Sequence, residues 1–172
     1  MSSNLLVRLA LALGANIGAF AVYFGIVKFG IADQSSLAQS VLERLQEDPA
    51  GLQLRVDDLS GQLLTVGAAA IGISFVLAVI WLILLETNPP VGDASARAKR
   101  QPWAGLLIGT VLASAAASWA LLINAPIAEQ LAGGVAITGT AAAVALAVVG
   151  YWLGTGLGAP RSCKVAVPGF GS

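Results

Sequence analysis

Four long apolar runs, none with a charged side chain in its middle, constrain this 172-residue chain more than any other feature. We place them at about residues 5–31, 62–85, 103–123 and 131–157. A helix of roughly 20 apolar residues crosses the bilayer core of about 30 Å, and these runs are too long and too uniformly apolar for barrel strands. The sequence therefore predicts an all-α integral membrane protein with four transmembrane helices, arranged as two antiparallel hairpins within a domain of residues 1–158.

The composition excludes several classes of protein. Only 10% of the residues are charged and 57% are hydrophobic, whereas about a quarter of the residues in a soluble domain are charged. Nine basic and nine acidic residues do not make a polybasic nucleic-acid binder. The absence of histidine excludes His-ligated metals and Ser-His-Asp or Cys-His catalysis, and the single cysteine excludes an internal disulfide. We therefore expect no enzyme, no cofactor and no metal site.

The distribution of charge predicts the orientation in the membrane. The segment 87–102 carries Arg97, Lys99 and Arg100 against Asp93, whereas the segment 33–61 is rich in acidic residues. Because positive segments stay in the cytoplasm, we expect both termini and the 87–102 loop there and the 33–61 loop outside. The basic cluster of the inner loop is expected to contact anionic lipid. The Ala/Gly/Leu/Val bias and the compact loops suggest a bacterial inner (plasma) membrane.

A cleaved signal peptide is the alternative interpretation of the first run. Gly30 and Ala32 are small residues at the spacing of a cleavage site. The apolar run is longer than the core of a usual signal peptide, however, and Lys28 lies just before that site. We therefore favour an uncleaved membrane anchor.

The outer loop contains a predicted amphipathic helix. Leu37, Val41 and Leu45 fall on one face at helical spacing, after a capping serine, and proline at position 49 would end the helix. This apolar face either lies in the lipid headgroups or docks on a partner subunit.

The remaining connections are predicted to lack long elements. Residues 52–56 alternate as a short strand does, and Asp57, Asp58 or Ser60 would cap the second span, although the two carboxylates also resemble part of a weak cation site. We expect the inner loop 87–102 to be a flexible connector and residues 159–172 to form a flexible cytoplasmic tail.

Small residues recur every fourth position on three of the spans. Such spacing lets helix backbones approach closely, so that packing holds the helices together in lipid. The one strongly polar residue well inside a span, Asn16, is more typical of a hydrogen bond between helices than of a substrate site. The helix-packing positions that we predict are Gly14, Asn16, Gly18, Gly105, Gly109, Ala113, Ala117, Gly150 and Gly154.

No ionisable side chain falls in the middle of a span, where transport pathways for ions usually have one. We therefore expect a non-catalytic structural or accessory subunit of a larger bacterial inner-membrane complex, surrounded by lipid and by other membrane-protein subunits. The alternative is a small homo-oligomeric channel or transporter for a neutral solute, lined by Asn16 and by serine and threonine. A weaker third possibility is a membrane enzyme that obtains its chemistry from another subunit or a bound cofactor.

Overall fold

The computed structural model describes residues 3–30, 49–123 and 134–170, and every long element in these ranges is a helix. Four of the helices are long and apolar enough to cross a membrane, which confirms the predicted all-α fold with four spans. The predicted amphipathic helix with Leu37, Val41 and Leu45 lies outside the described residues. The elements are α1 (Ser3–Gly30), α3 (Pro49–Thr87), α4 (Asp93–Ala98), α5 (Arg100–Ile123), α6 (Gly134–Gly158) and the 3-10 helix η1 (Arg161–Ala166).

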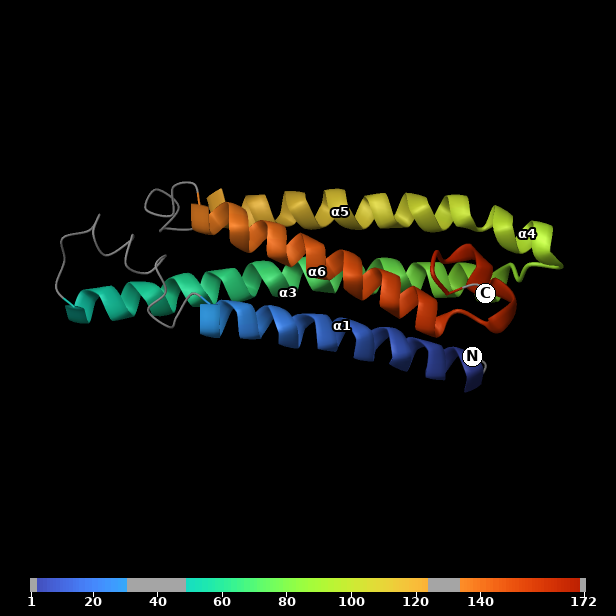
Figure 1. Ribbon diagram of the computed structural model, residues 1–172, viewed down its shortest axis with the longest axis horizontal. Coiled ribbons are helices and arrows are strands. Elements are labelled where there is room, and N and C mark those ends of the chain that lie inside the picture. Colours follow the sequence, from blue (N-terminus) through green and yellow to red (C-terminus); the bar gives the residue numbers. More distant parts are fainter. Residues whose placement is uncertain (1–2, 31–48, 124–133, 171–172) are drawn as a thin grey trace.

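The four long helices form one bundle in which successive helices run in opposite directions (Figure 1). Helix α6 packs against α1, α3 and α5, and α3 packs against α1, α5 and α6. The helices α1 and α5 lie at opposite corners, so α3 and α6 occupy the centre of the bundle. The first described residue, the C-terminal segment and α4 lie at the same end, which we call the α4 end (Figure 1).

Two clusters of buried side chains fill the bundle. One, toward the end away from α4, surrounds Tyr23 and Leu63, and the other, toward the α4 end, surrounds Trp81, Trp103 and Tyr151. The buried residues of α1 are three, four or seven positions apart, as expected for a helix that packs along one side. Its buried residues are Leu5, Ala12, Asn16, Ala19, Tyr23 and Val27.

Helix α3 is longer than the predicted second span. It begins at Pro49 and has 39 residues, so residues 52–56 are helical and the predicted strand is wrong. Asp57, Asp58 and Ser60 lie within the helix and do not cap it. The helix can begin at Pro49 because proline is favoured in the first turn of a helix. Five alternating residues are only a weak signal for a strand when a long helical segment follows them directly. A helix of this length extends about 58 Å, which exceeds the bilayer core of about 30 Å.

The two segments that we expected to be flexible are also structured. Residues 93–98 of the 87–102 connector form α4, and α5 begins at Arg100. In the C-terminal segment, η1 buries Cys163 and Ala166, and Val167 is 1% exposed. These small apolar residues follow the glycine-proline break without any periodic pattern, which is why their packing was not predictable from local sequence.

Candidate functional site

A polar junction in the middle of the bundle joins three of the spans through Asn16. Its side chain is 3% exposed, and its Oδ1 accepts a hydrogen bond of 2.9 Å from the Ser74 hydroxyl of α3. Its Nδ2 donates to the carbonyl of Ala12 at 2.9 Å and to the carbonyl of Gly150 on α6 at 3.5 Å. Each polar atom of the amide therefore has a partner, and the interactions tie α1 to α3 and α6 inside a low-dielectric interior.

Two of the predicted glycines lie against this junction. A Cβ atom at Gly150 would be 2.7 Å from Asn16 Oδ1, and a Cβ at Gly154 would be 3.4 Å from the Cα of Ala12. Both glycines are buried, so α6 approaches α1 closely at these positions. The structure thus brings Asn16, Gly150 and Gly154 together, which a sequence pattern within a single helix does not reveal.

The other predicted packing glycines lie mostly on the outer surface of the bundle. Gly14, Gly18 and Gly105 are exposed, and a Cβ at any of them would meet no atom within 4 Å. Gly109 is half-buried, and its Cβ would lie 3.8 Å from Leu77. Within this chain, therefore, Gly14, Gly18 and Gly105 do not lie between helices, whereas Gly109 borders α3.

Helix α5 faces the bundle with a different stripe, one of small polar residues. Thr110, Ser114 and Ser118 are fully buried, whereas Ala113 is exposed and Ala117 half-buried. The Ser114 hydroxyl donates to the carbonyl of Ala70 on α3 at 3.1 Å, and Thr110 donates to Leu106 of its own helix. The buried stripe of α5 is therefore offset by about a quarter turn from the predicted packing positions Ala113 and Ala117, since neighbouring residues point about 100° apart on a helix.

Beyond the predicted stripe, a shallow groove runs between α3 and α5. It has a volume of about 490 Å³, and its lining is almost entirely apolar. The groove opens outward and touches the predicted packing position Ala113. Its lining residues are Ala68, Ala69, Gly72, Ile73, Val76, Leu77 and Ala113.

Sequence reasoning missed a second polar junction, at Tyr23. The phenol is fully buried and donates to the carbonyl of Leu63 at 2.9 Å, and it lies 3.4 Å from the carbonyl of Gly139. Gly67 makes room for the ring, because a Cβ there would overlap the Tyr23 carbons. A tyrosine near a helix end usually marks the membrane interface, and no local signal distinguishes that role from this internal one.

Trp103 and Tyr151, near the α4 end, are also internal. Trp103 Nε1 donates to the Thr155 hydroxyl at 3.0 Å, and the Tyr151 hydroxyl donates to the carbonyl of Trp103 at 3.0 Å. The Trp103 and Tyr151 rings are tilted, with centroids 5.7 Å apart. These contacts attach the beginning of α5 to the last turns of α6.

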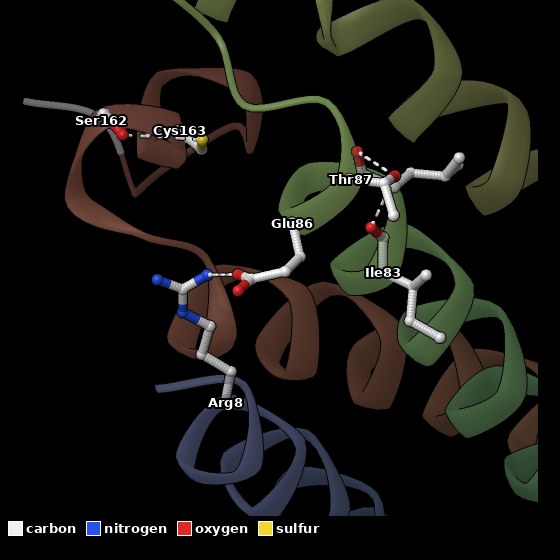
Figure 2. A network of polar contacts seen from close by, with 7 residues as sticks. Arg8, Ile83, Glu86, Thr87, Ser162 and Cys163 are labelled. Carbon is white, nitrogen blue, oxygen red and sulfur yellow. Dashed lines mark hydrogen bonds and ion pairs between the residues drawn. The ribbon is translucent and has the colours of Figure 1, made fainter. Parts of the chain in front are cut away.

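An ion pair closes the α4 end of the bundle. Arg8 of α1 and Glu86 of α3 point toward each other, with Nη1 and Oε2 3.0 Å apart (Figure 2). The side chains are 22% and 34% exposed, respectively. The same view contains the C-terminal segment, in which Ser162 Oγ lies 3.8 Å from the buried sulfur of Cys163 (Figure 2). The pair therefore joins α1 to α3 at the α4 end of the bundle.

Within residues 3–30, 49–123 and 134–170, no group of three or more His, Cys, Asp or Glu side chains is arranged to hold a metal ion. The arrangement that the bundle does offer is a set of hydrogen bonds between helices and several outward faces of small residues. Comparison of the chain with protein-family models, with curated proteins and with solved structures finds no match.

Proposed function

We propose that this protein is a non-catalytic structural subunit of a larger assembly in a bacterial inner membrane. One observation carries the proposal: buried Asn16, Ser74 and Ser114 bond the helices of this chain to one another, while small residues lie on the outside. Asn16 and Ser74 bond to each other, whereas a Cβ added at Gly14, Gly18 or Gly105 would meet no atom of another helix within 4 Å. Small residues on a helix surface favour close contact with another helix in lipid.

The same contacts weigh against the alternative of a pore for a neutral solute. Asn16 is 3% exposed and Ser74 and Ser114 are fully buried, so these groups do not face a channel between copies of the chain. The large side chains that do face outward are apolar, among them Ile17 at 59% and Leu112 at 65% exposure. Lipid or apolar protein surfaces are the environment that such faces suit.

Two outward surfaces of small residues lie at opposite corners of the bundle. One is formed by Gly14 and Gly18 on α1, and the other includes Gly105 and the groove edge at Ala113 on α5. Because α1 and α5 are far apart in the bundle, one neighbouring helix cannot cover both. The proposal therefore places this subunit between at least two partners.

The orientation belongs to the proposal as well. The basic residues Arg97, Lys99 and Arg100 lie at the α4 end, together with the described N-terminal residues and the C-terminal segment. The positive-inside tendency supports a cytoplasmic location for this end. The predicted docking face of Leu37, Val41 and Leu45 would then be on the periplasmic side.

The test compares the native mass of the assembly for three versions of the chain. After extraction of source membranes with a mild detergent, the unaltered chain should run in a hetero-oligomer of fixed composition. The variant G14L/G18L should lose a partner but keep its fold, because nothing in the bundle lies within 4 Å of either added Cβ. The variant A141L/A145L, which introduces leucine at two exposed alanines of α6, is the control.

Two results would overturn the proposal. A monomer or a pure homo-oligomer, obtained from native membranes, would contradict a role as a subunit of a larger assembly. An intact hetero-oligomer in G14L/G18L would show that the small-residue face of α1 does not bind a partner.

A further inference from the structure

The fold gathers basic side chains from two distant parts of the sequence at the α4 end. Arg97 lies on α4, Lys99 and Arg100 lie where α5 begins, and Arg161 and Lys164 lie on η1. The sequence suggests a weakly basic loop and a separate tail, but the structure packs η1 against α4 and α5. Five cationic groups therefore lie on neighbouring elements at the α4 end of the bundle.

Specific contacts hold the two basic segments together. Arg100 Nη2 lies 3.5 Å from the carbonyl of Val165, so the beginning of α5 reaches the backbone of the C-terminal segment. Cys163 and Val167 are 1% exposed and belong to the buried apolar cluster near the α4 end. This packing fixes η1 to the bundle. The Trp152 ring nitrogen donates to the carbonyl of Pro168 at 2.8 Å, which ties the segment to α6.

The acidic residues at this end do not balance the basic ones. Among the described residues, Glu86 and Asp93 are the acidic groups near the α4 end, and Glu86 is 3.0 Å from Arg8. Arg97, Arg100 and Arg161 are exposed, and Lys99 and Lys164 are half-buried. The assembled surface is thus strongly positive and largely open to its surroundings.

The position of this surface indicates what it binds. It lies where one candidate span, Asp93–Ile123, begins and another, Ile137–Gly158, ends, which is the depth of the lipid headgroups. Exposed apolar side chains lie in the last two turns of α6 at the same end, with Trp152 36% and Leu157 46% exposed. A soluble anion would interact with the basic side chains alone, whereas a lipid would contact the basic side chains through its headgroup and the neighbouring apolar side chains through its acyl chains.

We propose that the surface formed by Arg97, Lys99, Arg100, Arg161 and Lys164 binds the phosphate headgroups of anionic lipids in the leaflet at the α4 end. Guanidinium groups form paired hydrogen bonds with phosphate oxygens, and basic pockets beside transmembrane helices favour lipids of this kind. The C-terminal segment therefore completes a lipid site in addition to covering the bundle. This inference does not depend on the proposed role as a structural subunit.

The experiment measures lipid binding to the purified full-length chain in a neutral detergent by native mass spectrometry. Phosphatidylglycerol is titrated against phosphatidylcholine, with soluble glycerol 3-phosphate as a third ligand. The unaltered chain should retain phosphatidylglycerol in preference to both other ligands. The variant R161Q/K164Q should bind phosphatidylglycerol roughly 30-fold more weakly, because two charges near the headgroups are lost.

Two further variants serve as controls. R44Q/R55Q removes the same number of positive charges from the segment between the first two spans and should leave phosphatidylglycerol binding within about 2-fold of the unaltered value. R161K/K164R keeps both charges and should bind nearly as well as the unaltered chain. Thermal unfolding of each variant identifies any loss that results from misfolding, and R161K/K164R then decides whether charge is the cause.

The variant R97Q/R100Q tests whether both segments serve one site. A single site predicts that R97Q/R100Q and R161Q/K164Q weaken the same bound lipid. Two independent sites would instead lower the number of bound lipids without changing the affinity of those that remain, and this result would overturn the proposal. Equal weakening in R44Q/R55Q, or equal binding of glycerol 3-phosphate, would also overturn it.

Discussion

The amide oxygen of Asn16 accepts a hydrogen bond from the Ser74 hydroxyl at 2.9 Å, and the two residues are 58 positions apart in the sequence. Both side chains are buried at the contact between α1 and α3, beside the backbone of α6. Hydrogen bonds of this kind contribute about 0.6 kcal/mol on average within membrane bundles, and up to about 1.7 kcal/mol. This relationship makes the junction a suitable place to measure what holds the bundle together.

We expect N16L to lower the free energy of unfolding by about 1–3 kcal/mol, because it removes the three hydrogen bonds of the Asn16 side chain and places a larger side chain against Gly150. A double-mutant cycle with S74A should give a coupling energy of about 0.6–1.7 kcal/mol. Reversible unfolding in mixed micelles measures both values. T65A is the control, since Thr65 is exposed and its hydroxyl donates to the carbonyl of Gly61 in its own helix; a coupling as large between N16L and T65A would contradict the assignment.

Gly150 should tolerate no side chain while Asn16 is present. A Cβ atom there would lie 2.7 Å from Asn16 Oδ1, which the bond from Ser74 holds in place. We expect G150A to lower the free energy of unfolding by about 1–3 kcal/mol. The same substitution at Gly105, where nothing lies within 4 Å, should have no effect or raise stability by up to about 1 kcal/mol.

The combination G150A/N16A checks the cause of that loss. If the loss arises from overlap with the amide oxygen, the double variant should be more stable than the sum of the single effects predicts. Additive effects would show that the cost of a side chain at position 150 lies elsewhere.

Cys163 reports on the position of the C-terminal segment. It is the only cysteine in the chain and is 1% exposed, so a maleimide should label it slowly in the native bundle. A Cβ at Gly156 would overlap the Phe170 ring, which packs edge-on against Trp152 with centroids 5.2 Å apart. G156L should therefore displace the segment and raise the labelling rate by at least about 10-fold, as expected when a local opening costs about 1.4 kcal/mol less.

The matched substitution G105L introduces the same side chain at an exposed position and should leave the labelling rate unchanged. Fast labelling of the unaltered chain, or slow labelling of G156L in a folded bundle, would contradict the packing of this segment.

The ion pair between Arg8 and Glu86 should contribute only modestly to stability. The two side chains are 22% and 34% exposed, and partly exposed pairs contribute about 0–1 kcal/mol. E86Q should therefore lower the free energy of unfolding by at most about 1 kcal/mol, and the exchange R8E/E86R should recover part of that loss. The effect should decrease as ionic strength increases, because salt screens exposed charges; a loss that is independent of salt would indicate a different cause.

The sequence was sufficient to predict the four spans because their length and apolarity follow directly from the thickness of the bilayer. It was insufficient for the faces by which the helices meet. In a soluble bundle, polar residues mark the outside, but in lipid Leu112 on the outside and Leu122 on the inside of α5 have the same character. The rotation of α5 that buries Ser114 and exposes Ala113 is therefore set by contacts with α3 and α6 and not by a pattern within α5.

The contacts of Tyr23 could not be predicted from the sequence either. The hydroxyl of Tyr23 lies against the backbone carbonyls of Leu63 and Gly139. Every residue has a backbone carbonyl, so the residue types at positions 63 and 139 do not indicate this contact. Gly67, which admits the ring, is one glycine among 20 in the chain. Only the placement of three helices side by side distinguishes these residues from other apolar ones.

The central place of α6 has a consequence for the order in which the bundle is made. Helix α6 is synthesised after the other three described spans, yet it contacts each of them and supplies the Gly150 carbonyl near Asn16. Until it leaves the ribosome and enters the membrane, the Asn16 amide and the Tyr23 hydroxyl each lack one of their final neighbours. The nascent protein therefore passes through a state in which α1, α3 and α5 lack the neighbour that joins them, and translation of α6 completes both polar junctions.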